Sequence, residues 1–325
     1  MTRRLLLAVL LAVTCTACGG APSGTSAADG AVTLGFSAWP GWFPWQVAEE
    51  KGLFARNGVK VNLKYFDSYT DSLTALATGA VDANSQTLND TLASVSGGAE
   101  QTVVLVNDNS TGNDQIIARA GITSVAQLKG RTVAAEQGTV DHYLLLLALD
   151  KAGLTEKDVT FKPLPTDAAA AAFKAGQVDA VGVFAPFTTT ALELPGSTAI
   201  ATSKDFPGAI PDHLVVAREL ATSRPEVVQG LVKTWFDTLA WMRENPAEAR
   251  TIMARRAGVS EQAYADYDAG TTIFTLEQNR EAFASGDLER QAKEIAAFLT
   301  TAGLADTEPS LDGLFDPRFV QGVSS

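Results

Sequence analysis

Cysteine and histidine are scarce in this chain. Its two cysteines, Cys15 and Cys18, both lie near the N-terminus, and its two histidines are His142 and His213. Beyond Cys18 the chain therefore has no disulfide, no thiolate metal site and no Cys/His nucleophile pair. The two histidines are too few and too isolated to indicate a metal site, so we expect neither a metal nor a cofactor.

Positive charge is also in short supply. The chain has 25 Lys and Arg against 37 Asp and Glu, a net charge of −12, and loss of a leader containing Arg3 and Arg4 would make it −14. This balance argues against binding to nucleic acid or to an anionic lipid surface. No long apolar run beyond the leader reaches the ~20 residues that a membrane-spanning helix needs.

The N-terminus has the features of an export signal, with Arg3-Arg4, the apolar run Leu5–Val13 and then small residues. We expect residues 1–17 to be a signal peptide and residues 18–30, rich in Ser, Gly and Ala, to be a flexible tether. Thr16-Ala17-Cys18 resembles the lipobox of bacterial lipoproteins, which implies lipidation of Cys18. Cys15 stands where lipoboxes usually carry an aliphatic residue. The expected location is the outer face of the cytoplasmic membrane, or the periplasmic side, through a lipid anchor.

The chain contains an internal repeat. Gly79-Ala80-Val81-Asp82-Ala83 recurs as Gly176-Gln177-Val178-Asp179-Ala180, and the order strand, helix, strand, helix precedes both copies. Repeated β-α units predict two doubly wound α/β lobes with a ligand cleft between them. The aspartates of both copies lie at predicted strand starts, away from the cleft, so we expect them to be structural. The predicted strands are 31–36, 59–66, 131–135 and 159–164, and the predicted helices are 71–78, 140–152 and 167–175.

A further predicted strand, His213–Ala217, returns the chain to the first unit. We expect lobe 1 to comprise residues 31–115 and 213–325, and lobe 2 to comprise residues 116–212. A two-stranded hinge would join them and permit closure around a ligand. The C-terminal third reads as mostly helical. Ser124 and Ser223 each begin a capping-box pattern, which predicts that a helix starts after each of them.

Ligands of parallel α/β sheets bind beyond the carboxyl ends of the strands, where helix N-termini present free N–H groups. Three tryptophans, Trp39, Trp42 and Trp45, lie within seven residues of one another after the first predicted strand, and we expect one or two of them to contact the ligand rather than the core. Asn107–Asp114 could instead be a solvated turn, and Gln137-Gly138-Thr139 could simply cap the next helix. His142 is better explained as a core or surface residue than as a metal ligand. The predicted ligand-binding residues are Trp39, Trp42, Ser68, Gln86, Thr87, Asn89, Asp108, Gln137, Thr139, His142 and Phe184.

These motifs together resemble solute-binding proteins of the nitrate/sulfonate/taurine class. The resemblance rests on Trp39-Pro40-Gly41-Trp42 before Ala48–Phe54, on both Gly-x-Val-Asp-Ala segments, and on Phe184-Ala185-Pro186. It implies a type II periplasmic binding protein fold with two lobes joined by a two-stranded hinge. It also implies a monomeric binding protein, not an enzyme, that delivers a small solute to an ABC permease with its ATPase.

The candidate loops contain no Arg or Lys, although an anionic solute would need such donors. Aromatic residues beside carboxylates suit an ammonium group, so we expect an amine-containing solute, cationic or zwitterionic. Asp108 would bind the cation, and Trp39, Trp42 and Phe184 would surround it. Helix N-termini at Thr87 and Thr139 could hold an anionic group of a zwitterion. The carboxylates of these loops are Asp67, Asp90, Asp108, Asp114, Glu136, Asp141 and Asp167.

Other functions stay open at this point. The solute could be a sulfonate or nitrate anion, or a thiamine-precursor pyrimidine. An enzyme of the thiamine-precursor type could use the same fold, although the sequence has no Gly-x-Ser-x-Gly or phosphate-loop motif. A sensory or adhesive lipoprotein is a third class.

Overall fold

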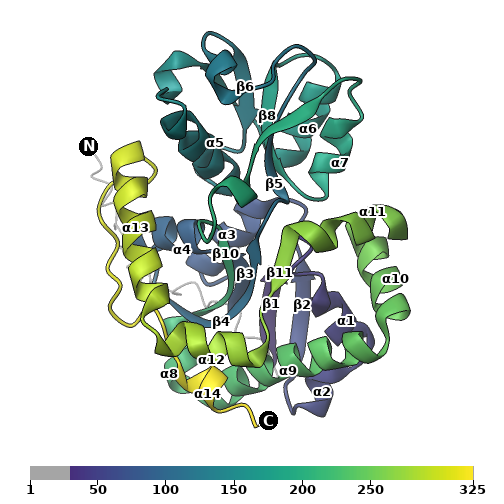
Figure 1. Cartoon of the computed structure of the whole chain (residues 1–325). Helices are drawn as coiled ribbons and strands as arrows, with labels where there is room; N and C mark the ends of the chain where they lie inside the picture. The colour runs from purple at the N-terminus through teal and green to yellow at the C-terminus, as the bar shows by residue number, and fades with distance from the viewer. Residues whose placement is uncertain (1–29, 325) are drawn as a thin grey trace, which may run out of the picture.

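Two mixed β-sheets form the frame of the computed structural model, which describes residues 30–324 (Figure 1). The first sheet has the strand order β11-β4-β10-β3-β1-β2 and the second has the order β7-β6-β8-β5-β9. The strands of the first sheet are β1 (Val32–Phe36), β2 (Val61–Tyr65), β3 (Ala83–Thr87), β4 (Gln101–Ser110), β10 (Pro211–Ala217) and β11 (Thr271–Ile273). Those of the second are β5 (Asp114–Ala118), β6 (Thr132–Ala135), β7 (Thr160–Pro163), β8 (Ala180–Phe184) and β9 (Thr198–Thr202).

The two sheets share one topology. In the first, β1 pairs in parallel with β2 and β3, and β10 lies antiparallel between β3 and β4. In the second, β6 pairs in parallel with β7 and β8, and β5 lies antiparallel between β8 and β9. In each sheet the antiparallel strand, β10 or β5, is the first strand that the chain forms after it arrives from the other sheet. The predicted two-lobed fold with a two-stranded connection is confirmed.

The repeated segment plays the same part in each sheet. Asp82 accepts a hydrogen bond from the N–H of Thr33 at 2.7 Å, and Asp179 accepts one from the N–H of Thr132 at 2.9 Å. Each carboxylate thus ties the start of the third strand to the start of the first strand of its unit. The glycine three residues before each aspartate, Gly79 or Gly176, has φ near +70°, a conformation that favours glycine and ends the preceding helix.

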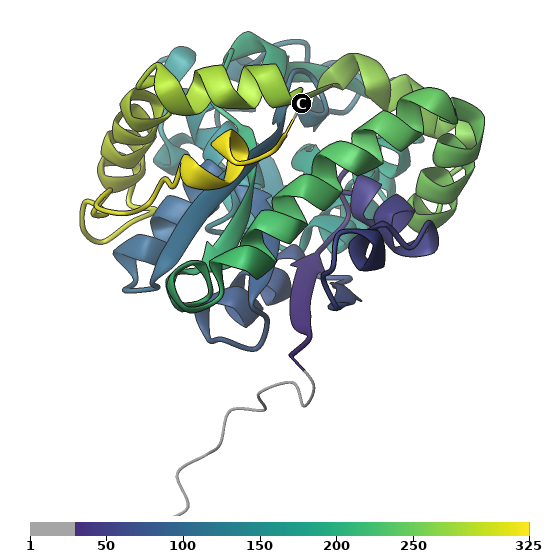
Figure 2. The ribbon, with the colours of Figure 1, turned by 90° about the horizontal axis from the view of Figure 1, so that it is seen from below.

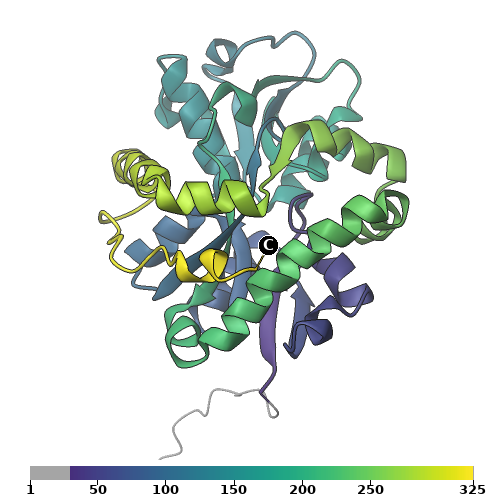
Figure 3. The ribbon, with the colours of Figure 1, turned by 60° about the horizontal axis from the view of Figure 1, so that its bottom comes forward.

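Helices cover the faces of both sheets. Around the first sheet lie α1 (Pro44–Glu50), α2 (Leu53–Arg56), α3 (Tyr69–Ala77) and α4 (Leu88–Ser96), and around the second α5 (Val140–Lys151), α6 (Thr166–Lys174) and α7 (Phe187–Leu192). The C-terminal helices are α8 (Arg218–Ser223), α9 (Pro225–Glu244), α10 (Pro246–Ala257), α11 (Glu261–Asp266), α12 (Leu276–Ala284), α13 (Asp287–Ala302) and α14 (Arg318–Gln321). Figures 2 and 3 show α9 running diagonally across the lobe that contains the first sheet.

The contact between α1 and α9 anchors this C-terminal layer to the first lobe. The Trp45 ring lies 4.7 Å from that of Trp235 and stacks on Phe54, and its indole N–H donates to Ser85 at 2.8 Å. Trp45 is fully buried, so the third tryptophan of the predicted ligand loop belongs to the core. Its buried position fixes the helix that follows the loop.

Two sequence predictions about helix starts have different outcomes. At Ser124 the capping box forms, with Gln127 accepting from the Ser124 N–H at 3.2 Å. At Ser223 the predicted helix does follow, as α9, but the predicted capping box does not form. The Ser223 hydroxyl donates to the Glu219 carbonyl at 2.7 Å inside α8, so it does not cap α9, which starts behind Arg224.

The chain changes sheet twice, between Ser110 and Asp114 and between Thr202 and Pro211. The lobe boundaries at residues 115/116 and 212/213 stay predictions. The predicted signal peptide, Cys18 and all of the tether except Gly30 lie outside the described residues. Within residues 30–324, no helix has both the length and the apolar character needed to cross a membrane.

Candidate functional site

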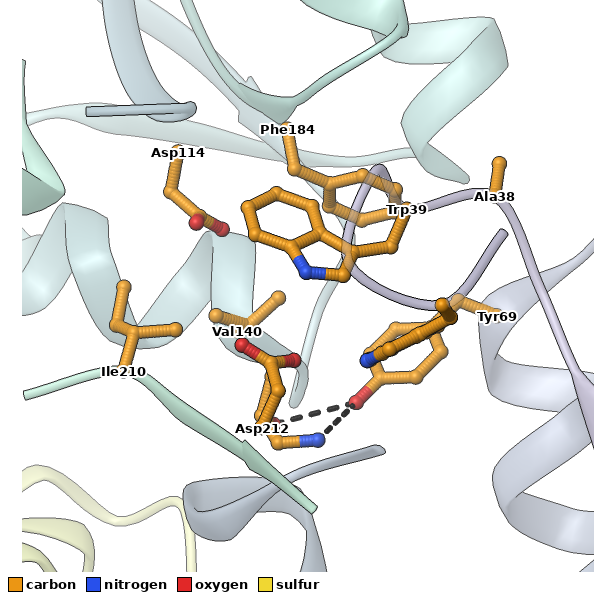
Figure 4. A pocket seen from close by; sticks show the side chains of 10 residues that line it. Ala38, Trp39, Tyr69, Asp114, Val140, Phe184, Ile210 and Asp212 are labelled. Carbon is orange, nitrogen blue, oxygen red and sulfur yellow. Dashed lines mark hydrogen bonds between the residues drawn. The ribbon is translucent and has the colours of Figure 1, made fainter. Parts of the chain in front are cut away.

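A narrow cavity lies where the loops after β1, β3 and β8 meet, between the two sheets (Figure 4). Its free volume is about 10 Å³, which is room for about one water molecule, so a larger solute requires the lobes to move apart. The first sheet's loops and the second sheet's loops both contribute to its wall, so its shape depends on how the lobes meet. The lining residues are Ala38, Trp39, Trp42, Tyr69, Thr87, Asp114, Val140, Phe184, Ile210 and Asp212.

Four aromatic rings in this wall form a closed circuit of contacts. Ring centroids are 6.4 Å apart for Trp39 and Trp42, 5.5 Å for Trp42 and Tyr69, 6.0 Å for Tyr69 and Phe184, and 6.3 Å for Phe184 and Trp39. Three of the rings come from the first lobe, and Phe184, at the end of β8, comes from the second. Phe184 meets Trp39 and Tyr69 edge to face, at 79° and 84°, so the rings pack against one another, and an organic cation held here would lie over a ring face that opens toward the cavity.

A buried carboxylate holds the Trp39 loop in place. The Trp39 indole N–H donates to Asp108 Oδ1 at 2.9 Å. A Cβ on Gly41 would lie 2.0 Å from Asp108 Oδ2, so only glycine allows the loop to pack this closely over the carboxyl group. The Tyr264 hydroxyl of α11 donates to the Pro40 carbonyl at 2.9 Å from the other side.

Asp212 and Asp108 are register partners on the antiparallel strands β10 and β4, which brings their carboxyl groups together. Burial raises the pKa of Asp108 to about 7. Burial, followed by the charge of Asp108, raises the pKa of Asp212 well above its usual range. Like charges this close disfavour double ionisation, so the pair retains a proton into the neutral range.

Asp114 adds a third buried acid at the start of β5. Burial raises its pKa to about 7. In Figure 4 the carboxyl groups of Asp114 and Asp212 both point toward the Trp39 indole. Among the described residues, Asp114 Oδ2, Asp212 Oδ2 and Trp42 Nε1 are buried polar atoms without a hydrogen-bond partner. The wall therefore presents a free donor at Trp42 and a free acceptor at Asp114, and Asp212 adds a second acceptor once the Asp108–Asp212 pair loses the proton that it retains.

Asp90 links the two lobes beside the cavity. One of its oxygens accepts from the Thr87 hydroxyl at 2.7 Å, and from the N–H of Val140, the first residue of α5, at 3.3 Å. Burial raises the pKa of Asp90 to about 7. The Tyr69 hydroxyl lies 3.2 Å from that of Thr87 and accepts from the Thr87 N–H at 3.1 Å, as the dashed lines in Figure 4 show. This network connects a wall residue of the cavity to the contact between the lobes.

The described wall of the cavity contains no basic side chain. Of the residues that the structure describes, no Lys, Arg or His lines this cavity. Across the same residues, no three of His, Cys, Asp and Glu lie close enough together to hold a metal ion. The site thus combines buried acids with aromatic rings and lacks a built-in counter-charge.

The structure brings four of the predicted ligand-binding residues to the wall of this cavity: Trp39, Trp42, Thr87 and Phe184. Asp108 lies behind Trp39 and is not part of the wall. Ser68 lines an adjoining cavity and caps α3 through the Asp71 N–H.

The other five predicted residues lie away from this wall. Gln86 is buried among Asn84, Thr91 and Gln101 on the opposite face of β3, since neighbouring side chains on a strand alternate. Asn89 donates to Asp90, and Thr139 donates to the Glu136 carbonyl. His142 stacks on Phe161 with a centroid distance of 4.4 Å and pairs with Glu156 at 2.8 Å, and Gln137 is exposed. Ligand contact by all eleven stays a prediction.

Sequence reasoning did not select Tyr69 or Asp212. Tyr69 lies in the loop after the second strand, beside Ser68, which was predicted to bind the ligand. An aromatic residue at that position could have been predicted to line the cavity. Asp212 directly precedes the predicted strand at His213. Its importance comes from pairing with Asp108, more than one hundred positions earlier, and local sequence does not show which strands pair.

Comparisons with known proteins agree with this architecture. The sequence profile of the NMT1-like family matches residues 26–258. A putative binding protein of Brucella abortus is 28% identical over 98% of this chain and 97% of its own length. The taurine-binding periplasmic protein of Escherichia coli is 27% identical over 80% of this chain and 83% of its own.

Solved structures show the same fold at lower identity. The alkanesulfonate-binding protein SsuA from Xanthomonas axonopodis pv. citri, bound to MOPS, has a TM-score of 0.77 at 20% identity, covering 88% of this chain and 98% of its own. The desulfurization enzyme DSZB has a TM-score of 0.65 at 19% identity, covering 89% and 98%. The fold therefore occurs both in binding proteins and in an enzyme.

Proposed function

Because this chain belongs to the NMT1-like family, we propose that it is the extracytoplasmic solute-binding component of an ABC importer. Its two lobes close on a small amine-containing solute, cationic or zwitterionic. The observation that carries the choice of solute is the wall of the cavity. It joins four aromatic rings to the carboxyl groups of Asp114 and Asp212, with no basic side chain among the described lining residues.

Buried carboxyl groups without a counter-charge favour a cationic ligand. Desolvation is what raises the pKa of Asp114, and it acts on Asp212 in the same way. An ammonium group between these carboxyl groups would restore the electrostatic stabilisation that they lack, and the surrounding rings would add cation–π attraction. A plain anion would bring like charge to the same oxygens.

The free indole N–H of Trp42 favours a solute that also carries a hydrogen-bond acceptor. A buried donor without a partner costs free energy that an acceptor on the ligand would recover. An amino-sulfonate, an amino acid or an amino alcohol has both features. This combination keeps zwitterions within the proposed class.

The transport role is supported by the relatives and by the lobe contacts. The relatives at 27–28% identity are named binding proteins, one of them for taurine. Phe184 and Val140 of the second lobe meet Trp39, Tyr69 and Asp90 of the first lobe at the cavity. A solute enclosed there would stabilise the closed arrangement of the lobes that a permease could distinguish from an open one.

Two other functions have particular observations in their favour. Sulfonate binding is favoured by the relatives' names, but the wall offers a free donor only at Trp42. Enzymatic activity is favoured by the fold shared with DSZB, but no Cys, Ser or His lies among the described residues lining the cavity. A binding protein for an amine accounts for more of the wall than either alternative.

We also propose that the first segment, residues 1–17, is removed and that Cys18 is lipidated. Lobe 1 then comprises residues 31–115 and 213–325 and lobe 2 residues 116–212, working as a monomer with a permease and its ATPase. Mass spectrometry of the exported protein tests the first point. A mature N-terminus at a lipid-modified Cys18 supports it, and an unmodified Cys18 or cleavage elsewhere contradicts it.

The solute class is tested by thermal shift and calorimetry with choline, butan-1-amine, taurine, ethanesulfonate and nitrate. We expect stabilisation by one or more of the nitrogen cations or by taurine, and none by ethanesulfonate or nitrate. Turnover of none of the bound compounds is expected. Stabilisation by the plain anions alone would overturn the amine assignment, and turnover would overturn the assignment as a carrier.

A further inference from the structure

A second cavity adjoins the first and shares Ala38, Tyr69 and Phe184 with it. Its free volume is also about 10 Å³, so a ligand that enters it requires a less tightly closed arrangement of the lobes. The two cavities therefore lie on either side of the same aromatic pair. A ligand that extends past Tyr69 and Phe184 would occupy both.

The second cavity is also acidic, and both lobes supply the acids. Asp67 follows β2, Glu136 follows β6, and Asp167 lies in the first turn of α6. No Lys or Arg is found among its described lining residues. Asp67 and Asp167 are exposed at the rim, whereas Glu136 is only 7% exposed.

Glu136 is held in position without meeting a positive charge. One of its oxygens accepts from the Thr70 hydroxyl across the lobe contact. The other accepts from the Thr166 hydroxyl at 2.7 Å and the Thr166 N–H at 3.2 Å. All three donors are neutral, so the carboxylate is orientated but its charge has no hydrogen-bonded counter-ion among the described residues.

A second observation in this cavity points to a ligand. Ser37 is one of the lining residues and is 1% exposed, and its hydroxyl oxygen has no hydrogen-bond partner among residues 30–324. Buried hydroxyl groups without a partner are uncommon in folded proteins. A donor or acceptor on a ligand would satisfy it.

Building on the proposed amine-binding function, we propose that the solute is an elongated dication with a cationic nitrogen at each end. One nitrogen lies in the first cavity near Asp114 and Asp212. The other lies in the second cavity near Glu136 and Asp167. The apolar link between them runs along the rings of Tyr69 and Phe184, which both cavities share. A monoamine would leave the acids of one cavity without a counter-charge.

Calorimetry with matched pairs of ligands tests this inference on the full chain. Butane-1,4-diamine is compared with butan-1-amine, and pentane-1,5-diamine with pentan-1-amine. 4-Aminobutan-1-ol controls for length and polarity without the second charge. We expect at least one diamine to bind about tenfold more tightly than its monoamine and than the amino alcohol, since one of the new ion pairs is buried and the others are exposed.

Two variants locate the second nitrogen. Glu136→Gln removes the charge and keeps one acceptor oxygen for the Thr166 hydroxyl and N–H, while its amide NH2 can donate to the Thr70 hydroxyl oxygen. Asp167→Asn removes a rim charge. Each is expected to reduce the diamine-to-monoamine affinity ratio. Asp71→Asn, an exposed substitution in the first turn of α3 with the same change in charge, is expected to leave the ratio unchanged. Thermal unfolding of each variant verifies that it is folded.

The outcomes separate the two proposals. Equal affinity for diamines and monoamines would overturn the dication and leave the amine-binding function standing. A diamine preference that Glu136→Gln and Asp167→Asn do not reduce would overturn the second site. Binding of plain anions alone, with no amine bound, would overturn the proposed amine class itself.

Discussion

Replacing Asp212 by Asn removes a carboxyl group that would ionise beside a bound ammonium group and keeps the shape of the side chain. Asp212 Oδ2 is buried and has no hydrogen-bond partner among the described residues, so in the proposed complex it faces the ammonium group of the solute. Asn can still accept a hydrogen bond there. The substitution therefore isolates the contribution of charge to binding.

The expected loss follows from Coulomb's law. Unit charges about 4 Å apart attract by roughly 4 kcal/mol at an effective dielectric constant near 20. Asp114 remains in the cavity and retains part of this attraction. Removing one partner of a buried charge pair costs about 2–5 kcal/mol in measured complexes. We therefore expect a loss of about 3 kcal/mol, or roughly 100-fold in Kd.

Calorimetry with butan-1-amine and choline measures the change, and Asp71→Asn is the matched control because it removes the same charge from an exposed position. Without ligand at pH 8, we expect Asp212→Asn to be at least as stable as the parent protein, since the repulsion between Asp212 and Asp108 is removed. Weaker binding together with undiminished stability excludes misfolding as the cause. A Kd within about threefold of the parent value would refute the reasoning.

Three further predictions concern pH, the free indole and the loop glycine. The pKa values of Asp90, Asp108 and Asp114 are raised to about 7, so the ligand-free protein should lose stability as the pH rises from about 4 to about 7, where the unfolded chain has ionised these groups and the folded protein has not. Choline, a permanent cation, should bind more tightly as the pH rises toward 7 and the carboxyl groups of the wall ionise. A flat melting temperature over this range, together with choline affinity that falls with pH, would contradict this. Trp42→Phe should weaken taurine binding by about five- to tenfold and butan-1-amine binding less, because it removes one hydrogen bond to an acceptor that only taurine carries. Calorimetry with both ligands measures the two losses. Equal losses would count against a donor role for the indole. Gly41→Ala should lower the free energy of unfolding by about 2 kcal/mol, since the new Cβ would meet Asp108 Oδ2 at 2.0 Å. Gly97→Ala is the control, because its new Cβ would have no atom nearer than 3.3 Å. Denaturant unfolding compares the two variants, and equal effects would show that the contact with Asp108 does not cause the loss of stability.

Much of the fold could be predicted because its signals are local or repeated. The predicted strand 31–36 became β1 (Val32–Phe36), and the predicted helix 140–152 became α5 (Val140–Lys151). The Gly-x-Val-Asp-Ala repeat predicted two similar units, and Asp82 and Asp179 indeed make equivalent backbone hydrogen bonds. Apolar periodicity and glycine turns are properties of short segments, so one sequence is sufficient to read them.

The site was harder to predict because it depends on contacts between distant segments. The sequence selected the loops after the parallel strands, and Trp39, Trp42 and Phe184 from these loops line the cavity. Asp108 was expected to bind the cation, but the indole of Trp39 covers it, and the acids in the wall are Asp114 and the strand partner of Asp108, Asp212. The pairing of β4 with β10 and the meeting of the lobes determine which carboxyl group faces the cavity. Neither is encoded in a local pattern.

Identification of the small molecule that the protein retains when purified gently from the producing cell tests the central claim most directly. Mass spectrometry of the released compound should find a basic nitrogen that is protonated at neutral pH, and for the dication two of them. A retained sulfonate, nitrate or other anion without a basic nitrogen would contradict the account.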